Sequence, residues 1–276
     1  RLNLGADFAF PKLHARWAQA VAGSALENAL RASSIQALAK TFEQYGVGIR
    51  DRQNVQKRLT VHLLQDLADI AHLLQPRLAE FYLRIVDRYF LENLKTILHY
   101  RYFPDASTDI AYLLVQVPRL PSLDPHLLLE ARSVHQFYTR LPSTKFKDDL
   151  LEILVELDDS KDMFVAETQI DALYYDHLGQ AVKELPIAAR QVADELVGTE
   201  VDATNIIAML RNTSVYHLPP ERIAELIIPG GGIEHKTITT DLVRYSRRDD
   251  LVHHLPRPYR SLLEPRLNQA MYRSEN

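Results

Sequence analysis

One stretch of this chain constrains its fold more than any other. Residues 150–185 run for 36 residues without a proline and with a single glycine, Gly179. Strands are usually 3–10 residues long, so an uninterrupted run of this length predicts helix. Acidic residues interrupt the apolar pattern near Asp158–Ser160. The sequence therefore predicts either one long helix or two helices separated at that point.

The preference for helix extends along the rest of the chain. Apolar residues recur at spacings of three or four between Leu59 and Leu74, which predicts one helical stripe. Alternating strand patterns are almost absent, and 14 prolines against 9 glycines punctuate the chain where helices would begin or end. Asp124-Pro125 has the form of an N-cap followed by a proline in the first helical turn. We predict an all-α fold.

Composition excludes several classes of protein. The 276 residues include no cysteine, which excludes disulfides, cysteine zinc sites and cysteine nucleophiles. A net charge of −4 gives no electrostatic reason to expect a nucleic-acid partner. No apolar run approaches the roughly 18 residues that a membrane span needs, and the first ten residues lack the apolar core of a signal peptide. We expect a cytoplasmic protein that is not itself inserted in the membrane.

The stretch PGGGIEHKT, Pro229–Thr237, approaches the phosphate-binding pattern G-x-x-x-x-G-K-[ST], with His235 in place of the second glycine. A phosphate loop follows a strand, whereas residues 219–228 have helical spacing and end at Pro229. We therefore interpret the stretch as a helix stop followed by a turn in which Gly230, Gly231 and Gly232 adopt backbone angles that other residues avoid. An enzyme that uses His235 and Lys236 remains an alternative.

Other chemical motifs are absent from the sequence. The 11 histidines include no HExxH motif and no paired metal-ligand spacing, and there is no GxSxG motif. Adjacent carboxylates, as in Asp249-Asp250, usually mark helix starts or solvated faces. We expect no catalytic residue, no metal site and no cofactor.

Internal similarity is more informative. The segments Asp7–Arg16 and Asp202–Arg211 both run from aspartate to arginine over nine positions, and Phe90–His99 is a weaker third copy. Asn93 in the third copy occupies the position of Asn205. Nine positions place Asp202 and Arg211 on opposite helix faces, whereas Asp202 and Asn205 share a face. We expect these two to cap a neighbouring helix or to join a buried polar network.

A second element recurs after each copy. An aromatic residue is followed four positions later by an aliphatic one, at Tyr45, Phe146 and Tyr259. Phe146 lies 53 residues after Asn93, and Tyr259 lies 54 residues after Asn205. The chain thus has the pattern of three related helical units, which we place at residues 1–84, 85–197 and 198–276.

In these residues and spacings, the chain resembles the C subunits of A-type and V-type rotary ATPases, whose eukaryotic counterparts are the d subunits. The stretches that carry the resemblance are DFAFPKLHAR, YFLENLKTILHYR, EVDATNIIAMLR and LIIPGGGI. The turn motif of that family, a threonine and then a tyrosine, matches Thr41 and Tyr45, while Phe90, His99 and Phe146 depart from the pattern in the second unit. The order and spacing of these stretches carry the resemblance, because none is specific alone.

The resemblance implies a funnel of three similar helical domains about a pseudo-threefold axis, with the third domain incomplete. It implies a non-catalytic central-stalk protein, part of a peripheral membrane complex, that joins the coiled-coil rotor shaft to the membrane proteolipid ring and transmits torque. We expect the repeat residues to maintain the unit geometry and the cavity wall: Asp7, Phe10, Arg16, Asn93, Asp202, Asn205 and Arg211. A helical adaptor or scaffold outside any motor is the alternative, and the order of the units, closed or linear, would distinguish the two.

Overall fold

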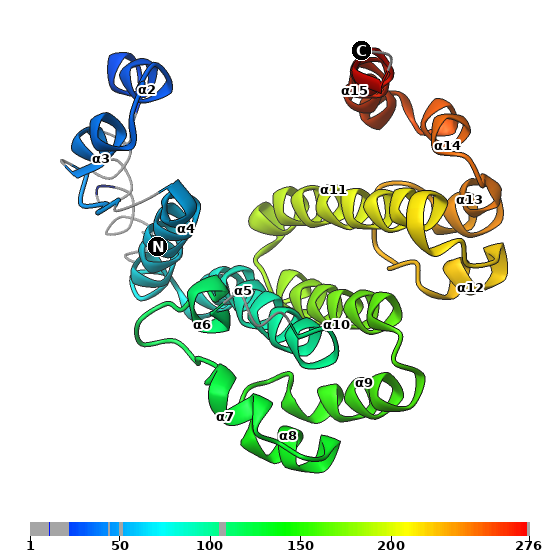
Figure 1. The fold of residues 1–276 in the computed structure, drawn as a ribbon, viewed down its shortest axis with the longest axis horizontal. Coiled ribbons are helices and arrows are strands. Elements are labelled where there is room, and N and C mark those ends of the chain that lie inside the picture. The colour runs from blue at the N-terminus through cyan, green and yellow to red at the C-terminus, as the bar shows by residue number, and fades with distance from the viewer. Residues whose placement is uncertain (1–10, 12–21, 44, 50–51, 105–108, 275–276) are drawn as a thin grey trace. The chain divides into compact units, whose positions relative to one another are not determined.

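The structure is a computed structural model that describes residues 11, 22–43, 45–49, 52–104 and 109–274. Every regular element in these residues is a helix, which confirms the predicted all-α class (Figure 1). The chain divides into two compact units, residues 1–151 and 152–276.

Among its described residues, the first unit contains seven labelled helices and the start of an eighth: α2 (Ser24–Leu30), α3 (Ile35–Glu43), α4 (Arg52–Ala71), α5 (Pro76–Tyr102), α6 (Ile110–Leu113), α7 (Pro125–Leu129), α8 (Val134–Arg140) and α9 (Lys147–Ser160). Proline positions define several boundaries. α5 starts at Pro76 and ends before Phe103-Pro104, as expected because the residue before a proline disfavours helical angles. Asp124 caps α7 by accepting a hydrogen bond from Leu127 N–H at 3.0 Å, as predicted.

The helix predicted around Leu59–Leu74 is α4, in which Ile70 of the predicted stripe is buried and Leu67 packs against the core. One position of the stripe departs from the prediction. Leu63 is exposed, and its neighbour Leu64 is buried instead. α4 packs on α5, and Leu64, Val86 and Val117 form the centre of the core there. The direction from which α5 approaches determines which residues of α4 are covered, and spacing alone does not contain that direction.

The second unit continues from α9 through α10 (Met163–Lys183), α11 (Ile187–Arg211), the π-helical turn η1 (Asn212–Tyr216), α12 (Pro220–Glu225), α13 (His235–Thr240), the 3-10 turn η2 (Leu242–Arg244), α14 (Arg248–His254) and α15 (Arg257–Ser274). The long run at residues 150–185 is two helices, the second of the two predicted forms. Lys161 breaks it with a left-handed φ of 58°, and Asp162 then caps α10 by accepting from Val165 N–H.

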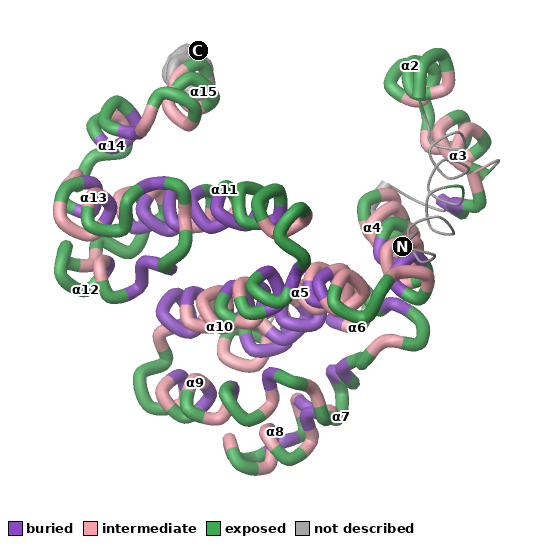
Figure 2. The backbone as a smooth tube through the Cα atoms, turned by 180° about the vertical axis from the view of Figure 1, so that it is seen from behind, coloured by how far each residue is buried: buried purple, intermediate pink, exposed green. Residues whose placement is uncertain are grey.

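The core of the second unit surrounds the C-terminal half of α11. Ile206 and Met209 of α11 pack with apolar residues from α12, α13, η2 and α14. The buried residues of these short elements are visible in Figure 2 as purple segments that alternate with exposed green ones. The short elements have little stability by themselves, so their positions depend on their contacts with α11.

Candidate functional site

The residues singled out in the sequence lie on two long helices and one loop. Asn93 is on α5, while Asp202, Asn205 and Arg211 are on α11. The glycines at 230–232 lie between α12 and α13. Asp7, Phe10 and Arg16 are outside the described residues.

Asn205 holds the segment that leads into the glycine loop. Its side-chain amide donates to Ile228 C=O at 2.8 Å, and its side-chain oxygen accepts from Ile228 N–H at 2.9 Å. Both residues are buried, so each bond satisfies a backbone group that water does not reach. The sequence predicted a helix over residues 219–228, but α12 ends earlier, at Glu225. The N–H of Ile228 bonds to Asn205 instead of to a carbonyl of a continuing helix.

Asn93 makes the same contact in the compact unit of residues 1–151. Its amide donates to Val115 C=O at 2.7 Å, and its side-chain oxygen accepts from Val115 N–H at 2.8 Å. The partner lies 22 residues downstream, compared with 23 residues for Asn205. The two asparagines that the sequence repeat aligns therefore have the same structural role. Each fastens an extended segment to the long helix that precedes it.

Asp202 is the most connected of the predicted residues. Its carboxylate accepts Ile233 N–H at 3.1 and 3.0 Å and the Tyr259 hydroxyl at 2.7 Å. Only 1% of Asp202 is exposed, so the carboxylate depends on these donors in place of water. The bonds join α11 to the loop before α13 and to the start of α15. Burial, together with the hydrogen bond to Asp202, raises the pKa of Tyr259 to about 12.

The structure requires glycine at positions 230–232 for two different reasons. The prediction that all three adopt unusual backbone angles is therefore wrong for two of them. Only Gly230 has a left-handed φ, at 97°. A Cβ on Gly231 would lie 2.0 Å from Asp202 Oδ1, and one on Gly232 would lie 3.2 Å from Oδ2. Gly231 and Gly232 therefore provide the space in which the carboxylate reaches Ile233 N–H.

Sequence reasoning missed other members of this region. Gly198 lies one turn before Asp202 on α11, and a Cβ there would meet Gly230 C=O at 3.4 Å. Asn212 bonds to both backbone groups of Leu218, at 2.8 and 3.1 Å, and closes η1. The available signal was an asparagine shortly before Pro219-Pro220, where a helix is expected to end, since Asn favours contacts with nearby backbone.

The copy of the repeat that contains Asn93 lacks the aspartate–tyrosine pair. Phe90 precedes Asn93 by three residues, as Asp202 precedes Asn205, and Phe146 takes the place of Tyr259. Both phenylalanines are buried. The acid and the hydroxyl are thus replaced together by apolar rings, which avoids leaving either polar group buried without a partner.

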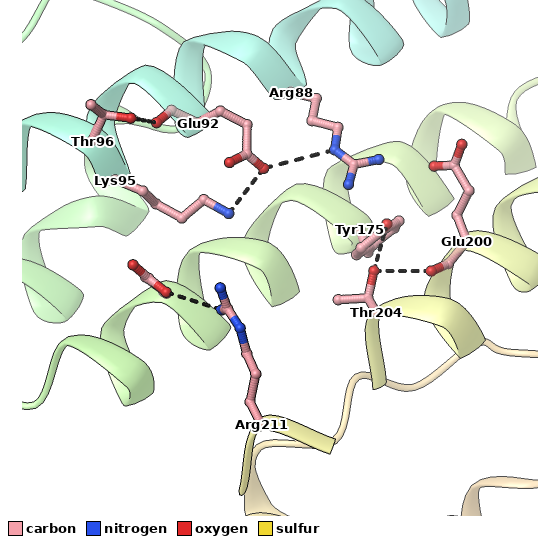
Figure 3. A network of polar contacts seen from close by, with 9 residues as sticks. Arg88, Glu92, Lys95, Thr96, Tyr175, Glu200, Thr204 and Arg211 are labelled. Atoms are coloured by element: carbon pink, nitrogen blue, oxygen red, sulfur yellow. Dashed lines mark hydrogen bonds and ion pairs between the residues drawn. The ribbon is translucent and has the colours of Figure 1, made fainter. Parts of the chain in front are cut away.

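Figure 3 shows further polar contacts along these helices. On α5, Glu92 accepts from Lys95 Nζ at 2.9 Å and pairs with Arg88 at 3.8 Å. In the second unit, the Tyr175 and Thr204 hydroxyls are 3.0 Å apart and connect α10 to α11. Arg211 pairs with Glu167 of α10 at 3.4 Å, so it and Asp202 have different partners.

The buried contacts of Asn93, Asp202 and Asn205 fasten loop segments to the long helices. His235 and Lys236, the residues of the enzyme alternative, are both exposed at the start of α13. A helix, not a strand, precedes the glycine loop. Within the part of the chain that the structure describes, no group of three or more histidines and carboxylates is arranged to hold a metal ion. No helix in that part has the length and apolarity to cross a membrane.

Comparison with known proteins decides the family. The family model described as ATP synthase (C/AC39) subunit matches residues 11–275. The chain belongs to this family. Its relatives include the C subunits of two A-type ATP synthases. That of Methanosphaera stadtmanae is 24% identical over 66% of this chain and 46% of the relative, and that of Thermococcus gammatolerans is 23% identical over 60% and 43%. The corresponding protein of Methanosarcina mazei is 24% identical over 52% of this chain and 39% of its own length.

The chain therefore spans less than half the length of the curated relatives that it matches. Membership of the ATP synthase (C/AC39) subunit family agrees with the resemblance drawn from the repeats.

Proposed function

We propose that this chain acts in the central stalk of an A-type or V-type rotary ATPase, where it connects the coiled-coil rotor shaft to the membrane proteolipid ring. In this role it transmits torque and catalyses nothing. It would lie on the cytoplasmic side as a peripheral part of the membrane complex. The observation that carries the proposal is the family match over residues 11–275.

The contacts of the long helices suit a part that must resist twisting. α5 has 27 residues and α11 has 25, so each is about 40 Å long at 1.5 Å per residue. Asn93 and Asn205 each fasten an extended segment to its helix by two hydrogen bonds. A segment that is held at two points by buried bonds resists rotation better than one held by apolar contact alone, because hydrogen bonds are directional.

The finer architecture is part of the same proposal. We place three similar helical units at residues 1–84, 85–197 and 198–276, arranged as a funnel about a pseudo-threefold axis. The matching contacts of Asn93 and Asn205 support equivalence of the last two units. The repeat residues Asp7, Phe10, Arg16, Asn93, Asp202, Asn205 and Arg211 would maintain the units and the cavity wall.

A reconstitution tests the connector role. The purified chain is mixed with the shaft proteins and the detergent-solubilised proteolipid ring of the same organism, and the complexes are weighed by native mass spectrometry. We expect one copy to bridge shaft and ring. Binding to neither partner by a chain whose circular dichroism is fully helical would refute the proposal. A chain that binds one partner without bridging would refute the torque path between them.

A further inference from the structure

Helix α15 packs on the core of its unit through few side chains. In the preceding helix, α14, Leu251 and Val252 are buried in that core. None of residues 257–265 of α15 is buried, and this part of the helix is green and pink in Figure 2. Two partly buried side chains at a spacing of four, Tyr259 and Leu263, pack against the core. The start of α15 therefore rests on the core by one narrow face.

Among these residues of α15, one side chain bonds to α11. The Tyr259 hydroxyl donates to Asp202 Oδ2 at 2.7 Å. The neighbouring polar side chains bond to α14 instead: Arg260 donates to His253 C=O at 3.2 Å, and Glu264 lies 4.0 Å from the His253 ring. These contacts to α14 are exposed to solvent, where polar pairs contribute little. The hydroxyl of Tyr259 is thus the polar link between α15 and α11.

The same carboxylate fastens the far end of the glycine loop. Ile233 N–H donates to Asp202 Oδ1 at 3.1 Å and to Oδ2 at 3.0 Å. The last torsion of a carboxylate side chain is soft, so the donors around it set its angle. If Tyr259 leaves, the buried carboxylate loses one of its two donors and turns towards water in compensation. Ile233 N–H then loses the geometry of its bond.

The near end of the loop is held in a different way. Ile228 bonds by both backbone groups to the side chain of Asn205, at 2.8 and 2.9 Å. These two bonds use no atom of Asp202 or of α15. The glycine loop therefore has two fastenings, and one of them depends on how α15 is seated.

We propose that α15 is a strap on the glycine loop. Seating of Tyr259 on Asp202 closes the far end of the loop at Ile233, and release of α15 opens that end while the end at Ile228 stays closed. Coupling between two equilibria is reciprocal, so a change that moves the carboxylate also loosens α15. This inference does not depend on the connector role, because all of its contacts lie within the unit of residues 152–276.

Native-state hydrogen exchange of the full chain, followed by NMR at the amides of Ile228 and Ile233, tests the strap. Tyr259→Phe removes the hydroxyl, and Leu263→Ala removes much of the other contact of α15 with the core. We expect each variant to accelerate exchange at Ile233 at least about fivefold more than at Ile228. Leu262→Ala is the matched control, because Leu262 is 69% exposed on the same helix, and it should change neither rate.

The reverse coupling is measured with spin labels. The chain has no cysteine, so Leu262→Cys on α15 and Thr199→Cys on α11 provide two unique labelling positions, both exposed. Gly231→Ala displaces the carboxylate of Asp202 and should broaden the distribution of distances between the labels in pulsed EPR. Gly179→Ala, where a Cβ meets nothing within 4 Å, should leave that distribution unchanged.

Three results would overturn the proposal. Equal acceleration at Ile228 and Ile233 in Tyr259→Phe, or none at either, would show that the hydroxyl does not control the far end of the loop. Acceleration in Tyr259→Phe without acceleration in folded Leu263→Ala would show that the seating of α15 is not involved. An unchanged label distribution in Gly231→Ala would exclude the reverse coupling. Circular dichroism checks that each variant folds, and if Leu263→Ala does not, Tyr259→Phe and the label experiment decide.

Discussion

Gly231→Ala tests the structural reason for the glycine loop. The added Cβ would lie 2.0 Å from Asp202 Oδ1, so the carboxylate has to move. It then loses two donors, Ile233 N–H and the Tyr259 hydroxyl. Hydrogen bonds to charged groups contribute about 1.5–3 kcal/mol each. Because the partly exposed Tyr259 can turn to water, we expect the free energy of unfolding to fall by about 3–4 kcal/mol.

The assay is urea unfolding followed by circular dichroism, with hydrogen exchange at residues 226–235 as a local readout. The φ of Gly231 lies outside the left-handed region, so backbone strain does not contribute. Gly179→Ala is the matched control, because Gly179 lies about one turn before the end of α10 and a Cβ there meets nothing within 4 Å. It should stabilise the helix by about 0.5–1 kcal/mol.

A double-mutant cycle provides the refutation. In an Asp202→Ala background the clash is gone, and Gly231→Ala should change stability by less than about 1 kcal/mol. The coupling between the two positions should therefore be about 3 kcal/mol. Equal losses from Gly231→Ala with and without Asp202 would show that the carboxylate is not the reason for the glycine.

Three further predictions follow from the same contacts. Asn205→Ala and Asn93→Ala should each lower the free energy of urea unfolding by about 2–4 kcal/mol, since each leaves two backbone groups without a partner; losses below about 0.5 kcal/mol would show that the clamps are dispensable. Asp202→Ala and Asn205→Ala should combine non-additively, because both fasten one loop, and strict additivity in the four-protein cycle would contradict this. Tyr259 has its pKa raised to about 12, so its neutral hydroxyl stabilises the fold fully below about pH 10 and progressively less as the pH rises towards 12. Tyr259→Phe should flatten the stability profile over that range, and a profile unchanged by the substitution would exclude the hydroxyl as its cause.

The elements that local chemistry controls were predictable from the sequence. Asp124 and Pro125 define the start of α7, and the acidic interruption near Asp158–Ser160 marks the break between α9 and α10. Capping bonds and proline restrictions act over one helical turn. The residues next to a helix end are therefore enough to predict where the helix begins or stops.

The site was predictable only as a set of residues, without their contacts. The repeat pairs Asn93 with Asn205, but the partners Val115 and Ile228 lie 22 and 23 residues away. Gly231 was interpreted as a conformational glycine, although its neighbour in space is Asp202, 29 positions earlier. No local rule connects positions so far apart.

The sequence by itself thus determined that the chain is helical and to which family its pattern is similar, because apolar periodicity, proline positions and the spacing of the repeated stretches can be read along the chain. Only the tertiary structure decided that Leu64 of α4 is buried in place of Leu63, where α12 ends and why Gly231 is glycine. Those features depend on which surface of one helix meets another segment. That choice is made by packing and by the pairing of buried polar groups after the chain has folded back on itself.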